Sequence, residues 1–242
     1  LTEGPLPVSV IVICRNAAST LRACLDAVLA QQPAEVIVAW TPIDADVPTR
    51  ALLDEFQDRV RVLEVLKPGI AVARNTGLAA ARAPYIAWCD ADDRWRAGKL
   101  TQQLKALADA PWSVCQLQKS DSNERVMGWT PSAMLATRAF IDAVGPWDTR
   151  FNVAADHDWM VRAKRRCDAA LVDTVLVDKG LDGQNASANR IAYRRELLRW
   201  VRLKGNSVED ADARPDDHED HDDHANRTRS IANKDIANED IV

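Results

Sequence analysis

The sequence of 242 residues contains no apolar run of about 18 residues, the length that a helix needs to cross a membrane. Its first residues also lack the charged stretch followed by an apolar core that is typical of a secretory signal. We therefore expect a cytoplasmic protein without a transmembrane segment. Peripheral association with a membrane stays open.

Cysteine pairs and excess positive charge are also lacking. The five cysteines are odd in number, scattered and never spaced as CxxC, so we expect reduced thiols rather than a disulfide or zinc framework. The formal net charge of −5 gives no electrostatic argument for a nucleic-acid partner. Apolar residues, by contrast, make up 47% of the chain, which is enough for a sizeable core up to about residue 205.

The first half of the chain alternates short β-branched runs with amphipathic segments. We expect strands at 8–13, 35–39, 60–65 and 85–89, and helices at 21–31, 49–56 and 70–82. Strand, helix and strand within about 30 residues make a βαβ unit with a right-handed crossover. The first run is almost entirely apolar, as in a parallel strand that is buried on both faces. The pattern predicts an α/β protein.

The second half is predicted to be more varied. We expect helices at 99–108, from Ala155 and at 190–201, strands at 112–118 and 171–177, a polar hairpin or loop at 119–128, and a short helix that begins within 134–140 with Thr137 as a cap. From Asn206 the composition becomes acidic and nearly free of large apolar residues. Such a segment cannot bury enough surface to fold, so we expect a disordered acidic tail at 206–242.

The stretch from Tyr85 to Trp95, YIAWCDADDRW, combines an apolar strand with a cluster of acids. The strand leads without a spacer into Asp90, Asp92 and Asp93. Crowded carboxylates need a cation or hydrogen-bond donors to compensate them. Open α/β sheets bind ligands outside the carboxyl ends of their strands. The stretch therefore predicts a divalent-metal or nucleotide site, and the alternative is an acidic turn that caps the next helix.

Two further groups of polar residues lie near predicted helix starts. Arg74 and Asn75 are near the start of helix 70–82, where amides and a guanidinium could face the phosphates of a nucleotide. Taken alone, Arg74 could equally be a solvated helix arginine. Asp156 and Asp158 lie in the first turn of a later helix, where carboxylates favour the helix dipole, so capping alone could explain them.

Three blocks of this sequence resemble the family 2 glycosyltransferases of the A-type (GT-A) fold, over roughly residues 7–200. They read VSVIVICRNAASTLRACLDAVLAQ, then GIAVARNTGLAAARAPYIAWCDADDRWRAGKL, then VGPWDTRF followed by AADHDWMVRA. The middle block is the most specific, because an ARN-x-GL helix that leads into a strand ending D-x-D-D-x-W is hard to produce by chance.

The resemblance implies a GT-A type Rossmann-like sandwich, with a mostly parallel central sheet flanked by helices. The glycosyltransferase domain would cover residues 1–205. Residues 8–95 would form the nucleotide-sugar-binding half and residues 96–205 the acceptor-binding half. The implied reaction is that of an inverting, hexosyltransferase-type enzyme. It moves a sugar from a nucleoside diphosphate to an acceptor nucleophile with the help of Mn²⁺ or Mg²⁺.

The family pattern also implies roles for individual residues. Asp92 would ligate the metal, and Asp90 would lie near the ribose or the metal. Asp93 would brace Arg74 or a loop. Asp156 occupies the place of the general base that takes the proton of the acceptor.

Further positions complete the site that the resemblance implies. Arg15, Asn16, Arg74 and Asn75 would contact the donor nucleotide sugar. In the segment LDGQNAS, Asp182 stands near the place of a histidine that ligates the metal in many relatives. The acceptor would be a saccharide, a lipid-linked glycan or a peptide.

The sequence departs from the family after the second strand, where relatives carry paired aspartates followed by Gly-Ser. Residues 39–42 read AWTP instead. Asp44 or Asp46 could substitute, or Trp40 could stack on the base. The departure keeps open a catalytically weakened member that acts as a binding or regulatory protein. A nucleotidyltransferase is a third alternative, but the loop CRNAAST lacks the glycine and lysine of a phosphate loop.

Overall fold

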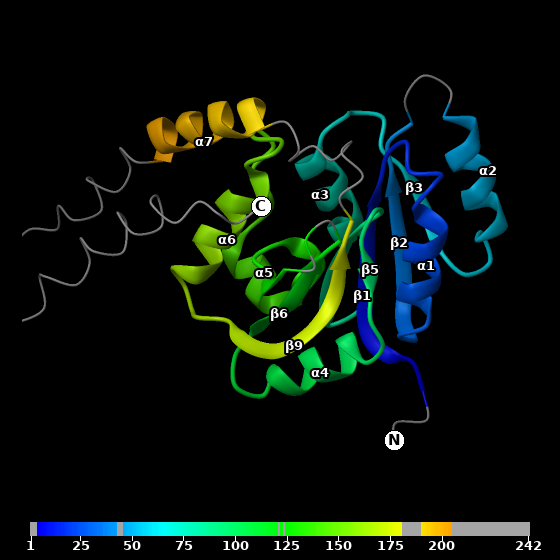
Figure 1. Ribbon diagram of the computed structural model, residues 1–242, viewed down its shortest axis with the longest axis horizontal. Coiled ribbons are helices and arrows are strands. Elements are labelled where there is room, and N and C mark those ends of the chain that lie inside the picture. The colour runs from blue at the N-terminus through cyan, green and yellow to red at the C-terminus, as the bar shows by residue number, and fades with distance from the viewer. Residues whose placement is uncertain (1–3, 43–45, 121, 123, 181–189, 205–242) are drawn as a thin grey trace, which may run out of the picture. The chain divides into compact units, whose positions relative to one another are not determined.

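A computed structural model describes residues 4–42, 46–120, 122, 124–180 and 190–204 (Figure 1). The chain divides into two compact units, Leu1–Ala188 and Asn189–Val242. In the second unit the described residues form helix α7 (Arg190–Lys204), where the sequence predicts a helix. The tail predicted at 206–242 lies outside the described residues. Among the helices that are described, none is long and apolar enough to span a bilayer.

The first unit alternates strands and helices as the sequence predicts. Its amino-terminal half contains β1 (Leu6–Cys14), α1 (Leu21–Leu29), β2 (Pro33–Trp40), α2 (Val47–Glu55), β3 (Arg61–Glu64), α3 (Ile70–Ala80) and β4 (Tyr85–Asp90). The rest contains β5 (Arg94–Trp95), α4 (Lys99–Ala106), β6 (Trp112–Lys119), β7 (Arg125–Met127), the 3₁₀ helix η1 (Pro131–Ala133), β8 (Met134–Thr137), α5 (Arg138–Val144), α6 (Ala155–Lys164) and β9 (Ala170–Lys179).

All the strands belong to one sheet. Their order is β3-β2-β1-β4-β8-β6-β9-β5, and β7 pairs with β6. The strands β3, β2, β1 and β4 are parallel, whereas β8 is antiparallel to both of its neighbours. Ile13 of β1 is paired with Asp90 of β4, so the carboxyl ends of these central strands lie side by side. The predicted α/β class is confirmed.

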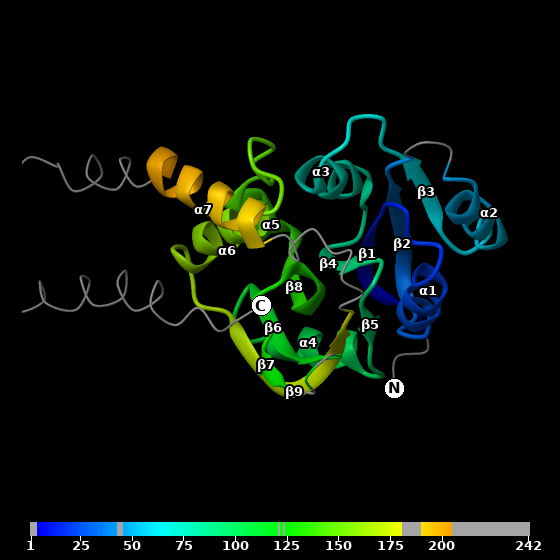
Figure 2. The same cartoon turned by 45° about the horizontal axis from the view of Figure 1, so that its top comes forward.

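Helices cover both faces of the parallel part of the sheet (Figure 2). Val8, Val10 and Val12 of β1 belong to a core that includes the buried side chains of α1. Ile11 points to the other face, where α3 packs at Gly77. A Cβ atom at Gly77 would lie 2.3 Å from Cγ2 of Ile11. Only glycine therefore allows α3 to approach β1 this closely.

A cluster of aromatic rings fixes α5 and α6 to the sheet. Its members are Trp88 of β4, Trp112 of β6, Phe140 of α5, Trp159 of α6 and Trp147 between the two helices. The rings of Trp147 and Trp159 stack with centroids 4.9 Å apart, and Trp88 lies 4.8 Å from Trp147. Buried aromatic pairs of this kind contribute strongly to stability. They hold the start of α6 close to the end of β4.

The structure differs from the prediction at two short strands. The helix expected to begin within 134–140 is preceded by strand β8, which fills the space between β4 and β6. Thr137 does cap the following helix, because its side chain accepts a hydrogen bond from the backbone N–H of Phe140. Strand β5, only two residues long, was not predicted either, and it pairs with the end of β9. The expected polar hairpin contains β7.

Candidate active site

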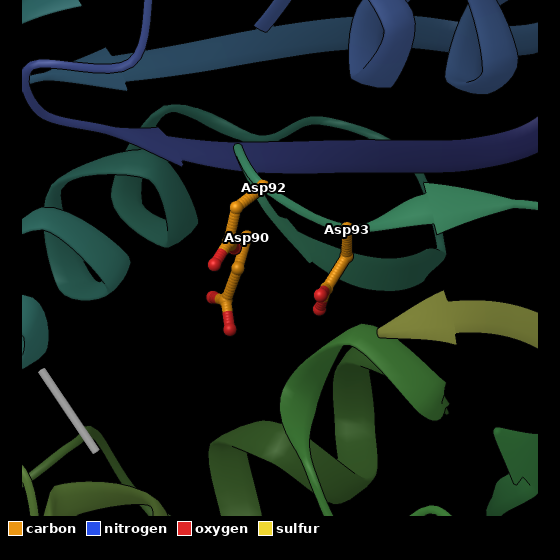
Figure 3. A group of neighbouring side chains, drawn as sticks. All are labelled: Asp90, Asp92 and Asp93. Carbon is orange, nitrogen blue, oxygen red and sulfur yellow. The ribbon is translucent and has the colours of Figure 1, made fainter. Parts of the chain in front are cut away.

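Three acidic side chains gather at the carboxyl end of β4 (Figure 3). Asp90 is the last residue of the strand, and a tight turn follows, in which the backbone N–H of Asp93 donates to the carbonyl oxygen of Asp90 at 3.0 Å. One carboxylate oxygen from each of Asp90, Asp92 and Asp93 lies within 4.8 Å of the other two. The predicted acidic cluster is therefore a compact group.

Lys179, the last residue of β9, lies against this acidic turn. Its Nζ is 3.2 Å from Oδ2 of Asp90 and 2.9 Å from Oδ2 of Asp93. The backbone N–H of Gly180 donates to the other oxygen of Asp93 at 3.0 Å. A Cβ atom at Gly180 would lie 2.0 Å from the carbonyl oxygen of Asp92, so the two chain segments touch. Asp93 thus binds the end of β9, and sequence reasoning did not identify Lys179.

Arg74 joins the acidic turn to α6. Its side chain is 1% exposed, which excludes a solvated helix arginine. Nη2 contacts Oδ1 of Asp90 at 3.0 Å, and Nη1 forms an ion pair with Oδ1 of Asp156. Charged groups of alternating sign therefore run in sequence through Asp156, Arg74, Asp90, Lys179 and Asp93. We refer to these five residues as the ion-pair chain.

The surroundings shift the pKa values of these groups in different directions. Burial raises the pKa of Asp90, but Lys179 and Arg74 outweigh burial, so its pKa is lowered. Burial, only partly offset by Lys179, raises the pKa of Asp92 to about 7, with Asp93 and Asp90 adding to the rise. Burial would lower the pKa of Lys179, but the three carboxylates raise it well above its usual value. Burial also raises the pKa of Asp93, although Lys179 opposes the rise. Asp92 differs from the other two acids in geometry, because among the described residues no ion pair reaches it.

Asp156 lies in the first turn of α6, but helix capping does not account for its contacts. Its carboxylate accepts from Arg74 and from Nε1 of Trp147, the latter at 3.3 Å. Its side chain is 30% exposed. Asp158 differs, because it is 1% exposed and forms an ion pair with Arg162 at 2.9 Å. Of these two acids, only Asp156 is part of the ion-pair chain.

The other predicted donor-binding residues lie in two places. Arg15 and Asn16 are exposed and directly follow β1, and Asn16 has a left-handed backbone with φ of 52°. Asn75 instead holds the backbone of Trp147, since its amide oxygen accepts from the Trp147 N–H and its amide nitrogen donates to the carbonyl, both at 2.9 Å. The predicted metal ligand Asp182 lies outside the described residues.

Two of the residues that could replace the missing aspartate pair, Trp40 and Asp46, are buried in this structure. Trp40 is 5% exposed, and the guanidinium of Arg50 lies over its ring. Asp46 accepts hydrogen bonds from the Trp40 indole and from the backbone N–H groups of Asn16 and Thr49. Neither side chain offers an open surface to a nucleotide base here. Asp44 lies outside the described residues.

The chemistry of the acidic turn fits a divalent cation. All the candidate ligands are carboxylate oxygens, which hard cations such as Mg²⁺ and Mn²⁺ prefer. When every group is ionised, the four carboxylates of Asp90, Asp92, Asp93 and Asp156 exceed the two cations of Arg74 and Lys179 by a formal charge of −2. One divalent ion would balance that charge.

Comparison with known proteins assigns the family. The sequence profile of Glycosyl transferase family 2 matches residues 9–164, more than half of the chain. The chain belongs to this family. A segment of 103 residues is 38% identical to WfgD of Escherichia coli, a UDP-Glc:α-D-GlcNAc-diphosphoundecaprenol β-1,3-glucosyltransferase. This segment covers 41% of the present chain and 40% of WfgD.

Two solved structures in complex with nucleotide sugars have a similar fold. The mannosyltransferase PcManGT of Pyrobaculum calidifontis, in complex with GDP-Man and Mn²⁺, has a TM-score of 0.63 and 20% identity over 86% of this chain and 67% of that one. S. aureus TarS 1–349, in complex with UDP-GlcNAc, has a TM-score of 0.64 and 13% identity over 75% of this chain and 60% of that one. The expected GT-A fold is confirmed. The chain spans less than two thirds of WfgD and of TarS 1–349.

Proposed function

We propose that this family 2 member is an inverting glycosyltransferase that moves a sugar from a nucleoside diphosphate to an acceptor nucleophile. The observation that supports this most is the ion-pair chain, which connects the acidic turn after β4 with Asp156 on α6. A leaving diphosphate and an attacking acceptor require separate groups on opposite sides of the sugar. The complexes of TarS with UDP-GlcNAc and of PcManGT with GDP-Man favour a nucleotide-sugar donor.

Asp92, with Asp90 beside it, is the proposed site of Mn²⁺ or Mg²⁺, and Asp182 is the further ligand that the family resemblance suggests. Such an ion, when bound, offsets the negative charge that develops on the leaving diphosphate. The Mn²⁺ in the PcManGT complex favours an ion of this class. Arg15 and Asn16 are exposed directly after β1, the strand that lies beside β4. They are proposed to contact the donor as well.

Asp156 is the proposed general base. The ion pair with Arg74 favours the carboxylate form, which a base requires. Arg74 and Trp147 both contact Oδ1 of Asp156. Among the described residues, no hydrogen bond involves Oδ2, and the side chain is partly exposed. Oδ2 can therefore take the proton of the acceptor while Oδ1 holds the carboxylate in place.

Two of the predicted donor-binding residues are better explained as positioning residues. Arg74 is buried between two acids, so we propose that it orients Asp90 and Asp156. Asn75 holds the backbone of Trp147, whose indole in turn donates to Asp156. Both residues would thus act on the base and on the acidic turn.

A catalytically weakened binding protein is the second candidate. The burial of Trp40 and Asp46 favours it, because neither of these two described residues is open to contact the base in place of the aspartate pair of relatives. The two candidates differ in the absence of acceptor. An active site should slowly hydrolyse its donor and release nucleoside diphosphate, whereas a binding protein should retain the donor intact.

The first experiment is a thermal-shift screen of nucleotide sugars with Mn²⁺. A ligand that binds the folded state raises stability by RT ln(1 + [L]/Kd), so the cognate donor should give the largest shift. The donor found is then tested for hydrolysis and transfer. The name of WfgD describes a lipid-linked acceptor, which makes a lipid-linked glycan the first acceptor class to test, ahead of free saccharides and peptides. No shift with any nucleotide sugar would overturn the proposal.

A further inference from the structure

Lys179 places a positive charge inside the cluster that is proposed to bind a metal. Its Nζ lies within 3.2 Å of carboxylates on two sides, and its side chain is 19% exposed. Few lysines are held this far from water unless their charge is matched. Here the match comes from Asp90 and Asp93, and the backbone N–H of Gly180 binds the second oxygen of Asp93. The ammonium is therefore part of the site.

The three acids of the turn differ in the number of cations and hydrogen-bond donors that contact them. Asp90 has a cation on each oxygen, Arg74 on Oδ1 and Lys179 on Oδ2. Asp93 is 1% exposed and has Lys179 on one oxygen and the Gly180 N–H on the other. Among the described residues, no ion pair reaches Asp92. A divalent ion would therefore meet one carboxylate without an ion-pair partner rather than three.

We propose that Lys179 is a positioning residue that acts as a built-in counter-cation of the acidic turn. It holds Asp90 and Asp93 in place without a metal, and by its charge it weakens the binding of a free divalent ion. The ion would then be held firmly only together with the diphosphate of the donor, whose oxygens add the missing ligands. This inference rests on the proposed metal site at Asp92.

Electrostatics decides the direction of the effect. With Lys179 the ionised site has a formal charge of −2, and without it the charge is −3, while Asp90 and Asp93 each gain a vacant oxygen. A unit charge a few ångströms away changes ion binding by well over a factor of ten at the effective dielectric constant of a protein surface, before water and salt reduce it. Lys179→Met should therefore bind Mn²⁺ about tenfold more tightly than the wild type.

The experiment measures Mn²⁺ affinity by electron paramagnetic resonance without nucleotide, so it depends on neither the donor nor the transfer reaction. Lys179→Met is compared with Lys179→Arg, which retains the charge and should behave like the wild type. Lys105→Met makes the same charge change on the exposed surface of α4 and should leave the affinity unchanged. If Lys179 only stabilises the fold, Lys179→Met will lower the melting temperature and leave the Mn²⁺ affinity unaltered. That result overturns the inference.

A measurement on the wild type keeps the inference testable if Lys179→Met does not fold. The melting temperature should be nearly the same in EDTA and in Mn²⁺ alone, and should rise when nucleoside diphosphate is added with Mn²⁺. A large stabilisation of the wild type by Mn²⁺ alone would contradict a built-in counter-cation. A lack of response to every nucleoside diphosphate with Mn²⁺ would instead contradict the proposed function, so the two failures can be told apart.

Discussion

The two ends of the parallel strands use charge in opposite ways. At the amino ends, a single carboxylate, Glu35 of β2, accepts from the hydroxyl of Ser9 and the backbone N–H of Arg82, both at 2.6 Å, and pairs with Arg61. Three donor groups therefore surround one carboxylate. At the carboxyl ends, three acids crowd within 4.8 Å, and the cations Lys179 and Arg74 pair with only two of them, Asp90 and Asp93.

This difference distinguishes a polar cluster that neutralises its own charge from the proposed functional site. The cluster around Glu35 satisfies its own charge and links β1, β2 and the segment before β4. When all its groups are ionised, the cluster at the carboxyl ends has excess negative charge, which costs folding free energy and which the proposed divalent cation would balance. We therefore expect substitutions at the amino ends of the strands to reduce only stability. Substitutions at the carboxyl ends should reduce function with little loss of stability.

The largest effect is expected from Asp156→Asn. An amide cannot take the proton of the acceptor, so transfer should fall by about two to four orders of magnitude. Donor affinity should survive, because the proposed donor and metal residues lie on β1 and the acidic turn. Single-turnover transfer and donor affinity are measured in parallel, with the exposed Asp168→Asn as a control. A variant that transfers at the wild-type rate would show that Asp156 only positions Arg74.

Substitution of Glu35, at the amino ends of the strands, should lower the stability of the protein. Glu35→Gln weakens hydrogen bonds to a half-buried carboxylate and should lower the free energy of unfolding by about 2 kcal/mol at pH 7. The exposed pair of Arg22 and Glu55 supplies a matched control, because Glu55→Gln should change stability by less than about 0.5 kcal/mol. Urea denaturation measures both. Equal effects of the two substitutions would remove the distinction between this cluster and an ordinary surface ion pair.

The pH dependence of the stability of Glu35→Gln tests whether the charge of Glu35 causes this difference. Burial raises the pKa of Glu35, but the hydrogen bonds from Ser9 and Arg82 and the charge of Arg61 outweigh burial, so its folded-state pKa is lowered. Its contribution to stability is therefore fully present above the unfolded value of about 4.3 and is lost as the pH falls through the lower folded value. The difference between wild type and Glu35→Gln should shrink towards pH 3. A constant difference would exclude this linkage.

The amino-terminal half of the fold was predictable because each of its elements has a local signal. The strands at β1, β2 and β4 are continuous apolar runs, and α1 carries its apolar residues at helical spacing. Strands β5 and β8 have no such signal. They are short, and they exist because distant strands supply partners, as in the pairing of Trp95 with Val177. The short helix expected to begin within 134–140 does form from Arg138, and the unpredicted strand β8 precedes it.

The residues of the candidate site likewise divide into those that have a local sequence signal and those that do not. Asp90, Asp92 and Asp156 stand in motifs that can be recognised from their immediate neighbours. Lys179 is 89 residues from Asp90 in the sequence, and its only local signal is a lone lysine before glycine at the end of an apolar strand. Such a lysine is usually solvated. Only the sheet order, which brings β9 beside β5, places its ammonium among the acids.

The smallest expected change in stability, that of Asp92→Asn, best distinguishes the cluster at the carboxyl ends of the strands from the cluster at Glu35. Asp92→Asn removes one negative charge from a crowded, partly buried group and keeps the shape of the side chain. Because Asp92 has the least compensation in the turn, we expect the metal-free protein to become more stable by about 1 kcal/mol, as is common when a functional residue is removed. Mn²⁺-dependent binding of the donor should be lost at the same time. Urea denaturation in EDTA and donor titration with Mn²⁺ measure the two outcomes, with the exposed Asp109→Asn as a control. A destabilised Asp92→Asn that still binds donor and Mn²⁺ would mean that the acidic turn, like the cluster at Glu35, serves the fold.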